Sequence, residues 1–319
     1  MRRSRDVPSL VAAAKAGDPR AVARLVSLVE NNDEALPAVA AALAPSTGTA
    51  QILGLTGSPG VGKSTTTNEL VRAFRQAGRR VGVLAVDPSS PFSGGAILGD
   101  RVRMQDHATD PNVYIRSMSS RGHLGGLAAA TPQAARVLEG AGCDPVIVET
   151  VGVGQAEVEV ASLADTTVVL LAPGMGDAIQ AAKAGVLEIA DIFVVNKADR
   201  DGADNTYRDI QGMIGLAERA AGQWRPQVVR AVASRGEGID DILAAIDKHR
   251  AWLADSGELR NRREARAAAE VEAIALGALR ERIGTLRNGD ALKSLATRVA
   301  DGEIDPYAAA DQLLSSLAE

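Results

Sequence analysis

The feature that most constrains this chain is a glycine-rich loop set between an apolar run and a helix-forming stretch. The apolar run covers residues 52–55 and the helix-forming stretch begins at Thr65, so the loop between them reads Gly57-Ser58-Pro59-Gly60-Val61-Gly62-Lys63-Ser64. A strand, a glycine turn and a helix together direct backbone N–H groups at a phosphate chain, because glycine lacks the Cβ that would block close approach. The pattern predicts a P-loop that binds a nucleoside phosphate.

Alternating strand and helix patterns extend from residue 51 to residue 250. Short apolar runs are separated by amphipathic stretches, at 52–55, 81–86, 145–148, 168–172, 192–195 and 228–232. This alternation is typical of a parallel sheet covered on both faces. We therefore predict an α/β fold, a mostly parallel P-loop NTPase sheet covered by helices, with its ligand at the carboxyl ends of the strands.

Helical patterns without strands flank this region on both sides. We predict an N-terminal helical segment at 1–48, a nucleotide-binding domain at 49–255 and a C-terminal helical arm at 256–319, with helices at 258–284, 290–301 and 305–318. The arm begins with a basic cluster, which we interpret as a solvated helix face interleaved with glutamates. Its members are Arg260, Arg262, Arg263 and Arg266.

Composition narrows the classes of partner. The formal net charge of the 319 residues is −5, whereas a general nucleic-acid binder normally carries a basic excess. We find no apolar run long enough to span a membrane and no signal-peptide pattern at the start. We therefore expect a cytoplasmic protein that binds neither nucleic acid nor membrane.

The residues expected around the phosphates belong to the loop and to two later strands. Lys63 would reach the β- and γ-phosphates, and the Ser64 hydroxyl would coordinate Mg²⁺. Asp87 and Glu149 each end a predicted strand, and Mg²⁺ takes one or two carboxylates besides waters and phosphate oxygens. Gly152 lies three residues beyond Glu149, where its N–H could sense the γ-phosphate. The alternative for either acid is a structural cap or ion pair.

A second motif, Asn196-Lys197-Ala198-Asp199, follows the apolar run at 192–195. A carboxylate accepts both N1–H and N2–H₂ of guanine, whereas adenine offers it no matching donor pair. We therefore predict that Asp199 selects guanine, with Asn196 and the Lys197 stem framing the ring. The alternative is a helix cap. After the next strand, the segment Val232-Ala233-Ser234 resembles the G-protein loop whose backbone touches the base, although Val232 stands where G proteins usually have serine.

The combined motifs resemble a known family. Glu149-Thr150-Val151-Gly152 with the motif at 196–199 is similar to metallochaperone-type P-loop GTPases. Three further stretches resemble the MeaB/ArgK-type branch, the chaperones associated with methylmalonyl-CoA mutase. They are Val86-Asp87-Pro88-Ser89-Ser90, the stretch 94–104 around Gly99-Asp100-Arg101, and Arg121-Gly122-His123-Leu124-Gly125-Gly126.

The resemblance implies a GTPase that gates adenosylcobalamin loading and protects or reactivates the mutase. It implies Mg²⁺ and GTP or GDP as ligands, no cobalamin bound directly, and methylmalonyl-CoA mutase with cob(I)alamin adenosyltransferase as partners. It further implies a homodimer formed by the C-terminal arm. Asp100 would move toward the metal on activation, and Asp177 and Lys183 would respond to the partner. Ala178 departs from the acidic residue expected beside Asp177.

Turnover should be slow without a partner, because no glutamine directly follows Gly152 to orient water. Two other functions stay open. One is an ArgK-type kinase that phosphorylates arginine or ornithine. The other is a GTPase that inserts nickel or cobalt, although His107, His123 and His249 show no ligand spacing.

Overall fold

The computed structural model describes most of the chain in two compact units. The first unit is Met1–Arg263 and the second is Glu264–Glu319. The described residues are 6–88, 105–107, 109–120, 130–150, 155–174, 186–220, 222–287 and 290–315. The domain boundaries predicted at 48/49 and 255/256 remain a proposal.

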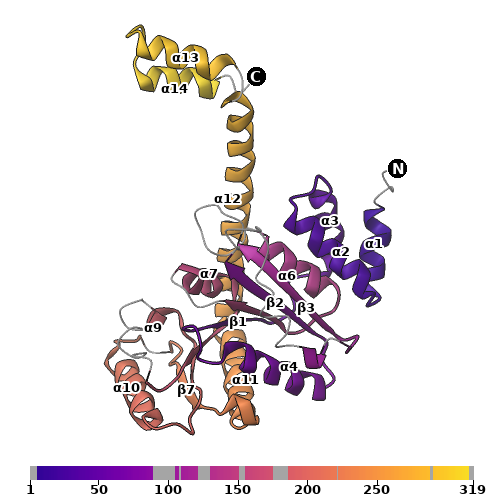
Figure 1. Cartoon of the computed structure of the whole chain (residues 1–319), viewed down its shortest axis with the longest axis vertical. Coiled ribbons are helices and arrows are strands. Elements are labelled where there is room, and N and C mark those ends of the chain that lie inside the picture. The colour runs from indigo at the N-terminus through magenta and orange to yellow at the C-terminus, as the bar shows by residue number, and fades with distance from the viewer. Residues whose placement is uncertain are drawn as a thin grey trace. The chain divides into compact units, whose positions relative to one another are not determined.

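A seven-stranded sheet forms the centre of the first unit (Figure 1). All its neighbouring strands are parallel, in the order β3-β2-β4-β1-β5-β6-β7. The predicted parallel α/β architecture is therefore confirmed, and β1, which leads into the glycine-rich loop, lies in the middle. The strands are β1 (Ile52–Thr56), β2 (Val81–Pro88), β3 (Val113–Ser120), β4 (Val146–Thr150), β5 (Thr166–Leu171), β6 (Ile192–Val195) and β7 (Gln227–Arg230).

Strand β3 is the one strand that the sequence patterns missed. Among the described strands it pairs only with β2, from Val81↔Val113 to Pro88↔Ser120, and so it is an outermost strand of the sheet. Its buried side chains include Tyr114 and Met118, while Arg116 is half-buried between them. Because buried and half-buried side chains are mixed along β3, its sequence lacks the continuous apolar run that marks the buried central strands.

Helices cover both faces of the sheet. Leu53 and Leu55 of β1 pack with α4 and α11, whereas the neighbouring Ile52 faces α6 and α7, as expected when successive side chains point to opposite faces. A smaller apolar cluster joins β5 and β6 to α10. These helices are α4 (Lys63–Gln76), α6 (Thr131–Gly140), α7 (Gln155–Leu163), α9 (Val186–Ile189), α10 (Ala203–Leu216) and α11 (Ile239–Ser256).

Three short helices precede the sheet and extend its core: α1 (Val7–Lys15), α2 (Pro19–Glu30) and α3 (Leu36–Leu43). Asp18 caps α2 by accepting from Arg20 N at 2.8 Å, and proline occupies the first turn, where its missing N–H costs nothing. Leu25 of α2 shares a core with Leu138 of α6. The Tyr114 hydroxyl donates to Gly17 O at 3.0 Å, so these helices are joined to edge strand β3.

Two buried aspartates mark the amino-terminal edge of the sheet. Asp165 precedes β5 and Asp191 precedes β6, and their exposed fractions are 1% and 5%. Each bonds the backbone of a strand: Ile52 N donates to Asp165 Oδ2 at 3.0 Å, and Thr167 N donates to Asp191 Oδ2 at 2.8 Å. Asp165 therefore links the start of β5 to β1, and Asp191 links the start of β6 to β5.

The same two aspartates bind the first turns of α12 (Glu258–Arg287). Arg262 forms a bidentate pair with Asp191, with both N···O distances 2.9 Å, and Arg263 Nη2 lies 3.1 Å from Asp165 Oδ2. The interpretation of this basic cluster as a solvated face is therefore wrong for these two residues. Sequence spacing along one helix could not reveal partners more than 70 positions away.

His249 of α11 lies beside these pairs and is fully buried. Its Nδ1 is 2.9 Å from the Thr166 hydroxyl, and its ring stacks near Trp252 with centroids 5.7 Å apart. Its Nε2 is 3.3 Å from Asp191 Oδ1. Burial lowers the pKa of His249 to about 4, although Asp191 acts to raise it. Because Arg262 already neutralises Asp191, burial decides the direction.

The second unit contains the remainder of α12 together with α13 (Asp290–Ala300) and α14 (Pro306–Ser315). Asp305 caps α14 by accepting from Tyr307 N at 2.9 Å. Arg298 Nη1 donates to Gln312 Oε1 at 3.0 Å and so links α13 to α14. Along the described helices, none is long and apolar enough to cross a membrane.

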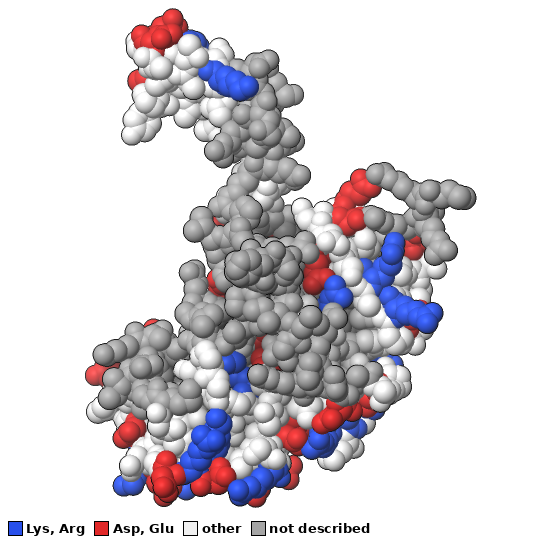
Figure 2. Space-filling model, in the orientation of Figure 1, with Lys and Arg blue, Asp and Glu red and all other residues white. Residues whose placement is uncertain are grey.

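Charged side chains of both signs are interspersed over the described part of the face shown in Figure 2. The ion pairs of the described residues include Arg72 with Glu69 at 2.7 Å and Arg230 with Asp204 at 2.9 Å. Exposed pairs of this kind contribute little to stability. The strongly constrained charges are the buried ones at the two edges of the sheet.

Candidate functional site

The glycine-rich loop connects Thr56, the last residue of β1, to Lys63, the first residue of α4. Gly57 has φ +137° and Gly62 has φ +101°, which side chains rarely adopt. A Cβ on Gly57 would lie 2.2 Å from Leu170 O, and one on Gly62 would lie 2.3 Å from Asn196 Nδ2. Both positions therefore require glycine, and the predicted strand–loop–helix unit is confirmed.

Lys63 turns back into this loop. Its ammonium donates to Gly57 O at 2.6 Å and to Ser58 O at 3.1 Å, and the residue is 8% exposed. Pro59 and Gly60 complete the exposed tip of the loop. The cation is thus held within the ring of backbone groups at which the sequence predicts the β- and γ-phosphates.

Glu149 and the start of α4 form a buried polar group next to the loop. Glu149 is 4% exposed and lies opposite Leu55 in the β1–β4 register. The Ser64 hydroxyl donates to Glu149 Oε1 at 2.6 Å, and the Thr67 hydroxyl donates to Oε2 at 2.7 Å. The structure therefore brings together two of the three predicted metal ligands.

This donor set fits Mg²⁺. Hydroxyl and carboxylate oxygens are the hard ligands that the ion prefers. Because the hydrogen of Ser64 is donated to Glu149, the lone pairs of its oxygen remain available to a cation. Asp87, the third predicted ligand, lies on β2 two residues beyond Ala85, which is in register with Glu149. Its backbone therefore ends at the same edge of the sheet.

Four other predicted residues lie outside the described residues. They are Asp100, Gly152, Asp177 and Lys183.

The predicted base-reading motif follows β6 and contacts the glycine-rich loop. Asn196 Nδ2 donates to Val61 O at 2.8 Å, while its Oδ1 accepts from Ala233 N at 3.0 Å. Lys197, at φ +55°, donates from Nζ to Gly60 O at 2.6 Å. The amide of Asn196 therefore bridges the loop and the segment after β7, which fixes three chain segments around one pocket.

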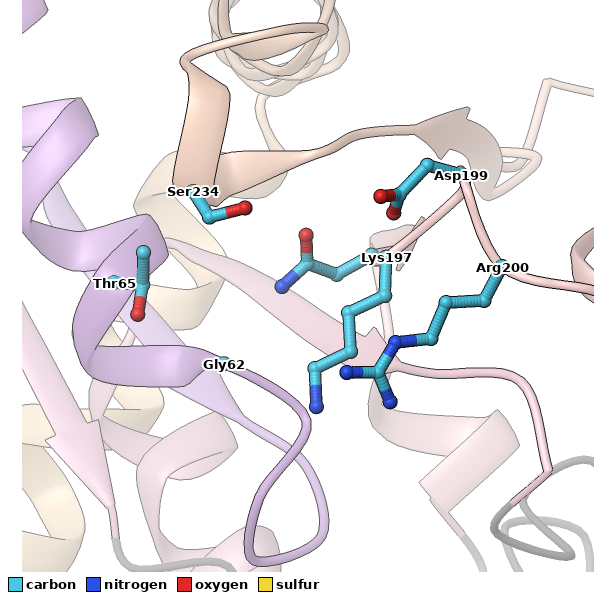
Figure 3. A pocket seen from close by; sticks show the side chains of 7 residues that line it. Gly62, Thr65, Lys197, Asp199, Arg200 and Ser234 are labelled. Atoms are coloured by element: carbon cyan, nitrogen blue, oxygen red, sulfur yellow. The ribbon is translucent and has the colours of Figure 1, made fainter.

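Figure 3 shows this pocket, lined by Gly62, Thr65, Asn196, Lys197, Asp199, Arg200 and Ser234. In this view the side chains of Lys197 and Arg200 both extend toward the glycine-rich loop, and the carboxylate of Asp199 turns toward Ser234. Asp199 Oδ2 also accepts from Arg235 Nη2 at 3.1 Å. Residues predicted separately from two motifs thus line the same pocket.

The segment after β7 contributes through its backbone. Val232 N donates to Glu237 O at 3.0 Å, and Ala233 N is used by Asn196. Ser234 is exposed at the pocket. The expectation that this segment lies against the pocket agrees with these contacts, while its contact with a base stays a prediction.

Sequence reasoning missed three residues at this edge. Thr67 lies three positions after Ser64 on α4, so helical spacing could have placed its hydroxyl beside the same partner. Arg200 directly follows the motif at 196–199, and Arg235 lies in the segment after β7. No role was predicted for either arginine, and the folded arrangement places Arg200 at the pocket and Arg235 against Asp199.

Comparison with known proteins gives consistent matches over nearly the whole chain. A family model described as methylmalonyl Co-A mutase-associated GTPase MeaB matches residues 22–288. A predicted GTPase of Pyrococcus abyssi is 47% identical over 315 residues, which cover 98% of this chain and 97% of the relative. GTPase ArgK of Escherichia coli is 38% identical over 255 residues, 78% of this chain and 77% of that one.

A solved structure described as LAO/AO transport system kinase has the same fold. It superposes with a TM-score of 0.73 at 26% sequence identity, and the match covers 100% of both chains. The similarity therefore extends to the helices before and after the sheet as well as to the sheet itself.

Proposed function

This chain belongs to the MeaB family of methylmalonyl-CoA mutase-associated GTPases, and from that premise we propose that its GTP hydrolysis gates adenosylcobalamin loading and protects or reactivates the mutase. The fold is that of a P-loop NTPase, and the relatives are named as GTPases. The observation that carries the proposal is the family match across 22–288, which spans both the glycine-rich loop and the motif at 196–199.

Contacts at the carboxyl edge support the proposed roles of the nucleotide-binding residues. Lys63 would exchange its bonds to Gly57 O and Ser58 O for phosphate oxygens, which are stronger acceptors because they are charged. Ser64, Asp87 and Glu149 would hold Mg²⁺ directly or through water. Bound there, the ion would neutralise charge on the phosphate oxygens.

Base selection is proposed to depend on Asp199. Its carboxylate faces the pocket and can accept two N–H groups from guanine, whereas adenine would leave it poorly satisfied. Asn196 and Lys197 frame the pocket through their bonds to the glycine-rich loop. Val232, Ala233 and Ser234 would complete it, chiefly through the backbone.

The partner-responsive residues are proposed from the sequence motifs. Gly152 would sense the γ-phosphate, Asp100 would move toward the metal, and Asp177 and Lys183 would respond to the mutase. No glutamine directly follows Gly152. We therefore expect slow hydrolysis by the free protein and faster hydrolysis when the mutase orders the water and the switch segments.

A homodimer is part of this proposal. Several apolar side chains of α12 are exposed within the second unit, including Val271 at 68% and Ile274 at 60%. A second copy of the arm would remove this surface from water. Sedimentation at micromolar concentration tests it: a dimer is expected, and a strict monomer would contradict this part of the proposal.

The deciding experiment measures GTP hydrolysis with and without methylmalonyl-CoA mutase from the same organism, with ATP as the control nucleotide and Lys63→Ala as the inactive control. Slow hydrolysis of GTP alone that rises with mutase is expected. GTP hydrolysis that is indifferent to mutase would preserve the GTPase activity and refute the proposed client. Adding cob(I)alamin adenosyltransferase then tests whether cofactor transfer depends on GTP.

An amino-acid kinase is the second candidate, because the structurally similar protein is described as a LAO/AO transport system kinase. The same preparation is incubated with arginine or ornithine and with GTP or ATP labelled in the γ-phosphate. This assay distinguishes hydrolysis of the nucleotide from phosphorylation of the amino acid. We expect label only in inorganic phosphate. Label in the amino acid above the level of the Lys63→Ala control would reverse the ranking.

A further inference from the structure

The segment after β7 is a closed loop with one well-defined shape. Val232 N donates to Glu237 O at 3.0 Å, Glu237 N donates to Val232 O at 3.3 Å, and Arg235 N donates to Val232 O at 2.9 Å. Gly238 has φ +77°, and a Cβ there would lie 2.2 Å from Arg230 O. The backbone from which Arg235 projects is therefore fixed.

This closed loop is attached directly to the motif that carries Asp199. Ala233 N donates to Asn196 Oδ1 at 3.0 Å, and Ala198 N donates to Ala231 O at 3.0 Å. Both bonds lie within four residues of Arg235 and within three residues of Asp199 along the chain. The distance between the two backbones is thus set by the fold, before any ligand is considered.

Arg235 uses this position to bind the carboxylate of Asp199. Its Nη2 is 3.1 Å from Asp199 Oδ2, whereas its Nη1 is 4.0 Å from Glu237 Oε1, the only other acid paired with it among the described residues. Lys197 is directed elsewhere, since its Nζ bonds Gly60 O. Of the two basic residues Lys197 and Arg235, it is therefore Arg235 that contacts the carboxylate of Asp199.

A carboxylate has about four lone-pair sites on its two oxygens, so one arginine N–H leaves acceptors for two donors of a base. The side chains of Asp199 and Arg235 are 35% and 58% exposed. An exposed ion pair contributes little to folding stability. It does restrict rotation of the carboxylate, and a group that is already oriented loses less conformational freedom when a ligand binds.

We propose that Arg235 is a positioning residue for base selection, which holds the Asp199 carboxylate in the orientation that accepts the two N–H donors of guanine. This inference rests on the proposed base-reading role of Asp199. It assigns Arg235 no contact with the phosphates and no part in hydrolysis. Its effect should therefore appear in the affinity for guanine nucleotides and not in the rate at saturation.

The test compares the affinities of the full-length protein and its Arg235→Ala variant for GDP and ADP. Loss of one side-chain restraint should weaken GDP binding about fivefold and leave ADP binding unchanged, so that the preference for guanine narrows by the same factor. The KM for GTP should rise while kcat stays constant. Arg235→Lys, which keeps one charged donor, should recover part of the loss.

Glu237→Gln is the matched control, because it removes the charge of the more distant acid and leaves the Asp199 pair in place. It should bind GDP like the parent protein. An unchanged preference for GDP over ADP in Arg235→Ala would overturn the inference, as would equal losses for both nucleotides or tighter GDP binding.

Asp199→Asn separates this inference from the proposed base reading. Its amide can donate to the xanthine carbonyl, so its preference should shift from GDP to XDP. If it still selects GDP, then the base-reading role itself fails. If it shifts to XDP while Arg235→Ala behaves like the parent, then Asp199 reads the base and only the role of Arg235 is refuted.

Discussion

The two edges of the sheet both contain buried charge, but the described contacts of that charge differ in kind. At the carboxyl edge, Lys63 bonds backbone carbonyls and Glu149 accepts from the hydroxyls of Ser64 and Thr67. At the amino edge, Asp165 and Asp191 bind arginines of α12. Neutral partners can be exchanged for a phosphate or a cation, whereas replacing a charged partner leaves a buried charge uncompensated.

This difference suggests a division of roles within one sheet: the carboxyl edge binds the ligand, and the amino edge stabilises the fold. Strand β6 is only four residues long, yet Asp191 precedes it and Asn196 follows it. Substitutions at one edge should therefore change nucleotide affinity, and those at the other edge should change the free energy of unfolding. Each of the following variants tests whether the two effects are in fact separate.

The largest effect is expected for Lys63→Ala. Loss of a charged donor from a buried phosphate site should lower GTP affinity by about 1,000-fold, or about 4 kcal/mol. The free energy of unfolding of the nucleotide-free protein should change by only about 1 kcal/mol. Calorimetric titration and urea unfolding measure the two quantities, and Lys248→Ala, an exposed lysine of α11, is the control. Unaltered GTP affinity would contradict the assignment of the loop.

The reciprocal variant is Asp191→Ala at the amino edge. It removes the acceptor of Arg262 Nη2 and of the Thr167 N–H, and it leaves Arg262 Nη1 with its bond to Asp165 O, so the free energy of unfolding should fall by about 3 kcal/mol. GTP affinity of the folded protein should stay unchanged. Asp255→Ala removes an exposed acid from α11 and is the matched control. A fall in GTP affinity that accompanies the loss of stability would show that the two edges are coupled.

His249 provides a pH-dependent version of the same test. Burial lowers its pKa from the ordinary histidine value of 6.5 to about 4 in the folded protein. Between these values the unfolded state binds more protons, so stability is full above pH 6.5 and is lost as the pH falls toward 4. The difference between the two pKa values corresponds to a loss of about 3 kcal/mol by pH 4.

Urea unfolding from pH 7.5 to 4 in the parent and in His249→Gln measures this contribution. The variant should show a shallower decline across that window. Asp110 does not interfere, because its hydrogen bond with Arg75 lowers its pKa, which moves its titration further from this window. Parallel declines in both proteins would mean that His249 is not the group that titrates.

The central strands and the carboxyl edge could be predicted because their signals are local. An apolar run predicts a buried strand, and the loop at 57–64 and the motif at 196–199 each lie within one short segment. Parallel topology then brings such segments to one edge without any knowledge of individual contacts. The motif at 196–199 itself predicted guanine, and the family resemblance added the proposed client.

The amino edge could not be predicted for the opposite reason. Arg263 finds Asp165 across 98 positions and Arg262 finds Asp191 across 71, and no spacing rule connects such residues. Read along α12 alone, the arginines match the pattern of a solvated face. Edge strand β3 was missed because its half-buried side chains do not form an apolar run. Pairing between distant segments is decided by the fold.

The smallest effect is expected for Thr67→Val, which keeps the side-chain shape and removes one hydroxyl donor from Glu149. Loss of this buried hydrogen bond should lower the free energy of unfolding by about 1 kcal/mol. If Glu149 serves the metal, its weaker restraint should also reduce the Mg²⁺ dependence of GTP binding by about threefold.

Thr66→Val is the control for this variant, because the Thr66 hydroxyl donates to Gly62 O at 3.0 Å and not to Glu149. It should lose similar stability and keep the Mg²⁺ dependence of the parent. If the two variants respond alike to Mg²⁺, then Glu149 is a fixed structural partner, like Asp191 at the opposite edge. The distinction between exchangeable and permanent partners would then hold for Lys63 but not for the metal side of the site.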